Sequence, residues 1–113
     1  MSQVTTHILD TTQGRPAAGV TIILHEWQHA DGWREIARGF TAADGQLLDL
    51  LLPDERLGHG AYQLRFLTQP YFEQQGLVGF YPFVDVCFVV GDDAHYHVPL
   101  LLSPFGYSTY RGS

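Results

Sequence analysis

Residues 61–68 have the sequence AYQLRFLT, and their alternation indicates the fold class of the chain. Every second residue from Tyr62 to Thr68 falls on one side of an extended strand, and this side is mostly apolar. The residues between them, Gln63 to Leu67, fall on the other side and are more polar. Period-two alternation of this kind predicts a β-strand with one face on a core and the other closer to water.

Segments rich in β-branched and aromatic residues recur between turn signals on both sides of this strand. Asp31-Gly32 and Asp44-Gly45 are Asp-Gly pairs, which favour tight turns. Pro70 and Gly76 are placed to begin and end one short helix within 69–76. We expect further strands at 4–10, 18–27, 33–40, 47–52, 83–90 and within 91–103. The pattern is typical of an all-β sandwich or barrel.

The segment 83–90, FVDVCFVV, is nearly continuously apolar, which predicts a strand covered on both faces. It contains the one cysteine of the chain, Cys87, which cannot form an internal disulfide. We expect this thiol to pack as a small hydrophobic side chain, since no cationic neighbour in the sequence would stabilise a thiolate.

Length and composition limit the classes of function. A chain of 113 residues fits a single domain, 1–113, and leaves little volume for a deep pocket within one subunit. Charged residues are only 16% of the chain, which suits a protein that covers part of its surface by oligomerisation. The net charge of −6 opposes binding to nucleic acid or to an anionic membrane. The N-terminal residues resemble no signal peptide and no apolar run is long enough to span a bilayer, which predicts a cytoplasmic protein.

Six histidines equal the arginines in number, and three of them suggest chemistry near neutral pH. His95 and His97 form a His-x-His pair in an expected strand, so both rings should point to the same face. His7 interrupts an uncharged strand, where a polar ring requires a partner. The other three are expected at the surface: His25, His29 and His59.

Two other kinds of site fit the residues less well. A zinc site could use the His-x-His pair, but no third ligand lies at a recognisable spacing. A serine nucleophile would need a G-x-S-x-G elbow, which is absent. Glycine-rich phosphate loops are also absent, so a nucleotide cofactor has no support.

Several segments together resemble the 5-hydroxyisourate hydrolases of the transthyretin-like family. They are TTHILDTTQGRPA at 5–17, WREIARGFTAADG at 33–45, GAYQLRF at 60–66, FYPFVDVCF at 80–88 and HYHVPLLLSPFGYSTYRGS at 95–113. The terminal YRGS separates the hydrolases from the thyroid-hormone carriers of the same family, which share the preceding SP-x-x-YST pattern. The resemblance covers essentially the whole chain.

The resemblance implies a transthyretin-like sandwich of two four-stranded sheets with one short helix. It also implies a homotetramer whose sites lie in a channel at the dimer–dimer interface. The implied reaction is hydrolysis of 5-hydroxyisourate, a small product of urate oxidation in purine catabolism, without metal or organic cofactor. The implied site residues are His7 and His97, which would assist the attack of water on a ring carbonyl, together with Tyr110, Arg111 and Ser113 of the terminal tetrapeptide. The resemblance does not imply which histidine acts as the base.

One position departs from the family pattern. The residue after Ala43-Asp44-Gly45 is Gln46, where the hydrolases have an arginine. Glutamine can bind a ring heteroatom of the substrate, but it carries no positive charge. Arg111 is the candidate to compensate for the missing charge. The alternative function is a transthyretin-like protein that binds a small ligand with weak or no hydrolase activity.

Overall fold

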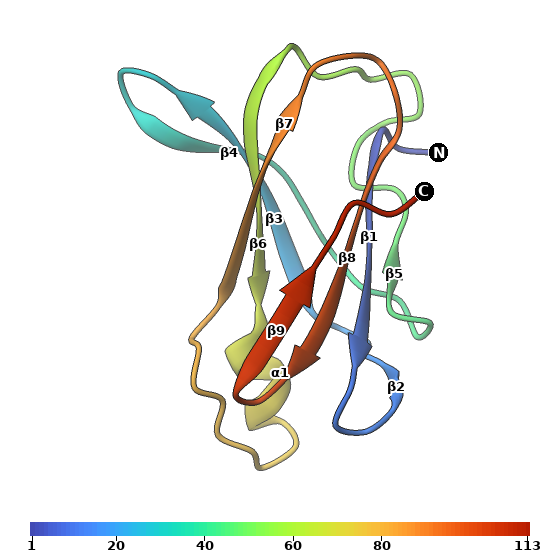
Figure 1. Cartoon of the computed structure of the whole chain (residues 1–113), viewed down its shortest axis with the longest axis vertical. Helices are drawn as coiled ribbons and strands as arrows, with labels where there is room; N and C mark the ends of the chain where they lie inside the picture. Colours follow the sequence, from blue (N-terminus) through green and yellow to red (C-terminus); the bar gives the residue numbers. More distant parts are fainter.

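Two β-sheets face each other across one core in the computed structural model, which describes residues 1–113 (Figure 1). The strands are β1 (Val4–Asp10), β2 (Arg15–Pro16), β3 (Thr21–Gln28), β4 (Gly32–Phe40), β5 (Gln46–Leu47), β6 (Gly60–Leu67), β7 (Val84–Val90), β8 (Tyr96–Ser103) and β9 (Gly106–Thr109). The single helix, α1 (Thr68–Glu73), follows β6. No helix of the structure could span a membrane.

The sheet that contains β3 has the strand order β4-β3-β6-β7, and all its pairs are antiparallel. The sheet that contains β1 has the order β2-β1-β8-β9, and β5 also pairs with β1. The predicted sandwich of two sheets with one short helix is therefore confirmed. The β1 sheet has five strands instead of four, because β2 and β5, of two residues each, share one edge of β1.

The core lies between the sheets, and the alternation within β6 directs its side chains as the sequence predicts. Tyr62, Leu64 and Phe66 are at most 2% exposed. They belong to one cluster of 20 buried apolar residues, to which β1 contributes Val4 and Ile8. Because alternate residues of a strand point to opposite faces, the residues between Val4 and Ile8 include a second set that faces away from the core.

The expected strand at 47–52 is wrong, because only Gln46–Leu47 forms a strand there. Leu50 and Leu51 are neighbours and both are buried, which a regular strand with one buried face cannot achieve. The Leu51 N–H instead donates to the Ser2 hydroxyl at 3.0 Å. The backbone in this segment is therefore held by a side chain rather than by a neighbouring strand.

The expectation that residues 83–90 are covered on both faces is also wrong. β7 is the edge strand of its sheet, and one of its faces lies outside the sandwich. Val89 is 71% exposed and Cys87 is exposed as well. The Cys87 thiol donates to the Gln63 side-chain oxygen at 3.5 Å, and partial desolvation of the sulfur, together with the nearby Asp85 carboxylate, raises the pKa of the thiol.

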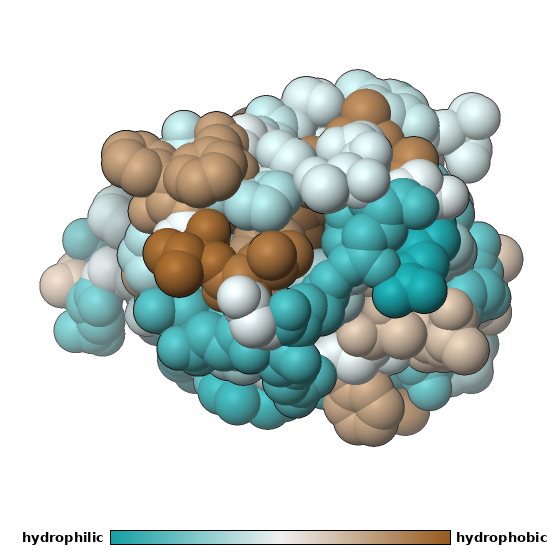
Figure 2. Space-filling model, turned by 90° about the horizontal axis from the view of Figure 1, so that it is seen from below, coloured by the Kyte–Doolittle hydropathy of each residue, from teal (hydrophilic) through white to brown (hydrophobic).

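Apolar side chains also gather at the end of the molecule that carries α1 and the β8–β9 turn (Figure 2). The exposed apolar residues there include Val78 and Phe80, in the loop between α1 and β7, and Phe105 in the β8–β9 turn, each at least 70% exposed. Apolar residues that gather at one end of the surface favour a contact with another molecule.

Candidate active site

Strand register brings His7, His97 and Gln46 onto the outer face of the β1 sheet. Gln46 of β5 is the register partner of His7, and His97 of β8 is the register partner of Thr5. Register partners point to the same side of a sheet, and His7 follows Thr5 by two residues. The two histidines therefore lie diagonally across neighbouring parallel strands, roughly 8 Å apart at their Cβ atoms.

The Thr5 hydroxyl connects the two histidines of the His-x-His pair. Its Oγ1 lies 2.8 Å from His95 Nε2 and 2.7 Å from His97 Nδ1. The two imidazoles stack with their centroids 6.1 Å apart and an angle of 28° between their planes. The prediction that both rings point to one face is confirmed. The sequence did not identify Thr5 as their shared partner, although it shares a face with His7.

His97 has the features of a base that is neutral near pH 7. Its Nδ1 is engaged by Thr5, whereas its Nε2 makes no hydrogen bond within the chain and is not buried. Burial of the ring lowers the pKa of His97, and the neighbouring His95 and His7 lower it further. The accessible Nε2 is the atom at which this ring can exchange a proton with a molecule on the outer face.

His7 is held against the turn that precedes β5. Gly45 in this turn has φ +78°, and a Cβ atom there would lie 2.6 Å from Ile8 O and 3.2 Å from His7 Cδ2. Only glycine tolerates both the positive φ and this close approach. The His7 Nε2 is buried without a hydrogen-bond partner, whereas Nδ1 also has no partner but is not buried. The open ring nitrogen of His7 is therefore Nδ1.

The C-terminal tetrapeptide runs beside His97. The Gly112 N–H donates to the His97 carbonyl oxygen at 2.8 Å, in antiparallel register. This register continues that of β8 with β9, so Tyr110 falls on the outer face with His97. Tyr110 and Ser113 are both exposed. The tail thus brings the Tyr110 hydroxyl group to the side of the sheet that carries the histidines, and Ser113 ends the tail next to Gly112.

Arg111 points to the other side of the tail. Its guanidinium carbon lies 4.5 Å from the centre of the Tyr96 ring, an arrangement that gives a cation–π interaction. Tyr96 is a core residue of β8, on the opposite face of the sheet from His97. The structure therefore gives Arg111 no position beside Gln46.

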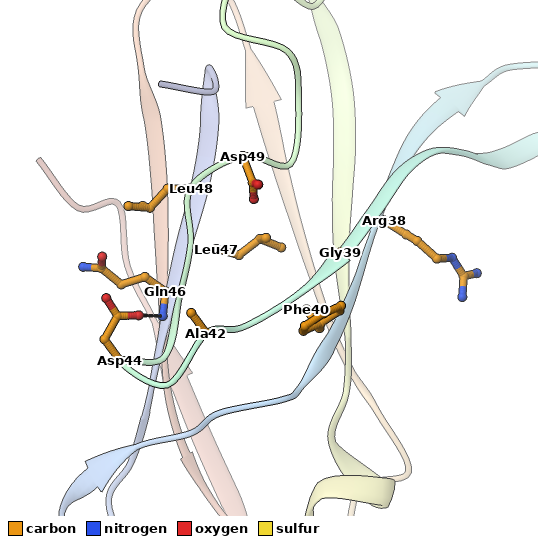
Figure 3. Close-up of a pocket in the computed structure, with 9 residues that line it drawn as sticks. All are labelled: Arg38, Gly39, Phe40, Ala42, Asp44, Gln46, Leu47, Leu48 and Asp49. Carbon is orange, nitrogen blue, oxygen red and sulfur yellow. Dashed lines mark hydrogen bonds between the residues drawn. The ribbon is translucent and has the colours of Figure 1, made fainter.

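Two hollows contain candidate residues, and neither of them brings all the candidate residues together. The hollow beside Gln46, of about 470 Å³, lies between the end of β4 and residues 42–49 (Figure 3). Figure 3 shows Gln46 and Leu47 pointing to opposite sides of this segment, and neither His7 nor His97 lines the hollow. His97 lines a different hollow, of about 320 Å³, with Tyr110 and Arg111. His7, His97, Gln46 and Tyr110 instead lie on one open face.

The remaining histidines lie elsewhere. His29 and His59 are exposed, as expected. His25 was expected at the surface, but it is half-buried on the β3 sheet and its Nδ1 is buried without a partner. Burial lowers the pKa of His25, and Arg65 lowers it further. No three His, Cys, Asp or Glu side chains form a cluster that could hold a metal ion.

The order of the strands and the helix after β6 define a β-sandwich of the transthyretin type. The chain belongs to the HIUase/Transthyretin family, which it matches over residues 4–112. It is 41% identical to the 5-hydroxyisourate hydrolase of Mus musculus, over 99% of this chain and 96% of that protein. It is 45% identical to the 5-hydroxyisourate hydrolase of Halalkalibacterium halodurans, over 98% of both chains.

Two solved structures show that the fold alone does not separate a hydrolase from a hormone-binding protein. The 5-hydroxyisourate hydrolase of Klebsiella pneumoniae has a TM-score of 0.85 and 36% identity, over 97% of this chain and 98% of its own. Sea bream transthyretin in complex with thyroxine has a TM-score of 0.90 and 32% identity, over 98% of this chain and 95% of its own. The backbone is similar to a hydrolase and to a hormone-binding protein alike, so the distinction depends on side chains.

Proposed function

We propose that this chain is a hydrolase that opens the six-membered ring of 5-hydroxyisourate to give 2-oxo-4-hydroxy-4-carboxy-5-ureidoimidazoline. The observation that carries the proposal is the face on which His7, His97 and Gln46 lie together beside the terminal tetrapeptide. The similarity to hydrolases from a mammal and a bacterium over nearly the whole chain supports the same reaction.

His97 acts as the general base in this proposal. Its open Nε2 takes a proton from a water molecule while the water oxygen bonds to the ring carbonyl carbon, and the carbonyl π electrons move to oxygen. When the carbonyl re-forms, the carbon–nitrogen bond breaks, and the imidazolium of His97 returns its proton to the departing nitrogen. The lowered pKa of His97 supports this assignment, because the ring is neutral when the water approaches.

His7 donates a hydrogen bond to the developing oxyanion in this proposal. A proton on Nε2 of the neutral His7 ring would leave a buried N–H without an acceptor, which is costly. The neutral ring with its proton on Nδ1 leaves only a lone pair at the buried position. The open Nδ1–H then faces the substrate, where a donor stabilises the negative charge of the tetrahedral intermediate.

The remaining residues hold the substrate. Tyr110 and Ser113 donate or accept through their hydroxyl groups, and Gln46 binds a ring heteroatom from the other edge of the face. We assign Arg111 a different role from the substrate contact expected from the family pattern. Its stacking on Tyr96 favours an anchoring of the tail beside His97.

We further propose that the complete site forms between subunits of a homotetramer, at the dimer–dimer interface. An open face that exposes Tyr110 requires another surface to exclude water from the reaction. The exposed apolar residues near α1 and the low proportion of charged residues also favour association. Sedimentation velocity at several protein concentrations tests this point, and a monomer at all of them would contradict it. The cytoplasmic location stays a prediction of the N-terminal sequence.

The second candidate function is binding of a small ligand without turnover. Gln46 favours it, because the arginine expected at this position could stabilise an oxyanion and glutamine carries no charge. The two functions are separated by mixing the protein with freshly generated 5-hydroxyisourate and identifying the product over time by ¹³C NMR. Faster appearance of the ring-opened product than in buffer supports the hydrolase. If the product appears only at the spontaneous rate, and the NMR lines of the substrate broaden when the protein is added, the chain binds the substrate without turnover.

A further inference from the structure

We propose that Thr5 and His95 are positioning residues that hold the proton of neutral His97 on Nδ1 through a directional chain of hydrogen bonds. The chain runs from His97 Nδ1–H to Thr5 Oγ1, and from the Thr5 hydroxyl to His95 Nε2. This inference rests on the proposed role of His97 as the base. It adds the reason why Nε2, and not Nδ1, is the nitrogen that accepts the proton.

The geometry allows only two directions for the hydrogen bonds that link His97, Thr5 and His95. The Thr5 oxygen lies within hydrogen-bond distance of one nitrogen from each ring, at 2.8 Å and 2.7 Å. A hydroxyl has one proton, so it can donate to only one of the two nitrogens. The other nitrogen must then carry its own proton and donate to the Thr5 oxygen. The tautomers of His95 and His97 are therefore linked, and neither ring can change alone without losing a bond.

Only one direction serves His97 both before and after it takes up a proton. The imidazolium form carries protons on both nitrogens, so its Nδ1–H must donate to Thr5. If neutral His97 already donates from Nδ1, the chain stays unchanged when Nε2 accepts the proton. In the opposite direction, the Thr5 hydroxyl would have to turn away from His97 during the reaction. A site arranged in advance for the charged form lowers the barrier without such a rearrangement.

The groups around these hydrogen bonds agree with donation from His97 to Thr5 and from Thr5 to His95. Thr5 is 1% exposed, so water does not compete for its hydroxyl. His95 is exposed, so its other ring nitrogen, which carries the proton in this arrangement, can donate to solvent. The groups beside these hydrogen bonds are the His7 ring, which shares the face, and the Gly112 backbone, which packs on His97. Arg56 and Asp93 line a small hollow together with His95. No carboxylate forms a hydrogen bond with any of these histidines, so Thr5 is the one hydrogen-bond partner of the His97 ring within the chain.

The matched test compares two neighbouring threonines. Thr5→Val removes the hydroxyl of the chain and keeps the shape of the side chain. Thr6→Val removes a hydroxyl from the next residue, which faces the core and donates to the Val98 carbonyl oxygen at 2.6 Å. Each variant is measured by ¹⁵N NMR of histidine-labelled protein above the titration range of histidine, where the tautomer of His97 is read directly. Thermal unfolding and kcat with 5-hydroxyisourate are measured in parallel.

The expected result is an Nδ1–H tautomer of His97 in the wild type and in Thr6→Val. The same tautomer is expected in Thr5→Ser, a further variant that keeps the hydroxyl group. Thr5→Val should shift His97 toward the Nε2–H form and lower kcat about 10- to 100-fold with little change in KM. An unchanged tautomer in Thr5→Val, or an Nε2–H tautomer in the wild type, overturns the proposal. If the wild type does not hydrolyse 5-hydroxyisourate, the proposed function fails, while the NMR measurement still decides the chain of hydrogen bonds.

A second variant does not depend on a buried substitution. His95→Phe removes the acceptor at the exposed end, which frees the Thr5 proton to be donated to His97 Nδ1. The proposal therefore predicts that His97 changes to the Nε2–H form in this variant. His95→Gln supplies a side-chain carbonyl as acceptor and should keep the Nδ1–H form. Equal tautomers in the two variants would contradict the direction of the chain.

Discussion

Gly112 lies so close to the His97 imidazole that a Cβ atom there would stand 2.6 Å from His97 Cδ2 and 3.2 Å from Pro99 Cγ. The Gly112 N–H donates a hydrogen bond to the His97 carbonyl oxygen at 2.8 Å, and this bond holds the tail close to the ring. The glycine of the terminal YRGS therefore has a steric function. It lets the tail pack on the ring of the proposed base without moving it.

Gly112→Ala should displace the tail or the His97 ring, because contacts under 3 Å with a packed ring cannot persist. A displacement of about 1 Å in such a site can slow a reaction about 100-fold. We expect kcat/KM to fall by at least about 10-fold, with a small change in stability because the tail is exposed. Gly106→Ala in the β8–β9 turn is the control, since a Cβ there has only one ordinary contact, at 3.7 Å. Equal rates in the two variants would contradict the steric role.

Gln46→Arg tests whether the missing arginine limits the reaction. The side chain at position 46 shares a face with His7, so a guanidinium there could reach the oxyanion. A charge-assisted contact stabilises a transition state by about 2 to 4 kcal/mol, which corresponds to a rate increase of about 30- to 1000-fold. Steady-state kinetics on Gln46→Arg and on the uncharged Gln46→Met check this. A rate in Gln46→Arg no higher than in the wild type would mean that glutamine suffices.

The pH dependence of kcat/KM should report the lowered pKa of His97. A base must be deprotonated, so the rate falls as the pH drops through its pKa. Burial, His95 and His7 all lower this pKa, so the acidic limb should lie below the usual histidine value of about 6.5. His95→Gln removes one of the neighbouring groups that lower the pKa of His97 and should move the limb upward. A limb that stays in place would show that His95 has no electrostatic influence on the base.

Much of the fold could be predicted from local patterns, because alternation and turn residues act over a few positions. β1 and the β3–β4 hairpin follow the expected segments closely, and the faces of β6 are as the alternation indicates. The exceptions depend on the position of a segment in the sheets. The apolar β7 is an edge strand, and the strand order that makes it so is not encoded in its own residues.

The site shows the same division. The spacing of His95 and His97 was enough to predict that both rings share a face. Their shared partner could not be predicted, since Thr5 precedes them by about 90 residues and meets them only through the parallel register of β1 with β8. The direction of Arg111 was equally hidden. It follows from the bridge between Gly112 and His97, which turns the neighbouring side chain toward Tyr96.

The free energy of unfolding should depend on a hydrogen bond that Tyr71, far from the candidate site, makes at the end of β1. Its hydroxyl donates to Asp10 Oδ2 at 2.7 Å, and Asp10 is 1% exposed. Burial and the Asp10 carboxylate raise the pKa of Tyr71 to about 12, so the hydroxyl stays protonated. Tyr71→Phe should lower the free energy of unfolding by about 1.5 to 3 kcal/mol in urea denaturation and leave kcat unchanged. Tyr107→Phe is the control, because the Tyr107 hydroxyl makes no hydrogen bond within the chain, and an equal loss of stability there would contradict the explanation.

The most direct test of the proposed hydrolase is the rate of decay of freshly generated 5-hydroxyisourate, followed by its ultraviolet absorbance. The wild type should accelerate the decay at least about 100-fold over buffer, as expected of general base catalysis in a formed site. His97→Gln, at equal concentration and with an unchanged far-ultraviolet CD spectrum, should lose most of this acceleration. A wild-type rate equal to the spontaneous rate would contradict the proposed function, and a fully active His97→Gln would contradict the assignment of the base.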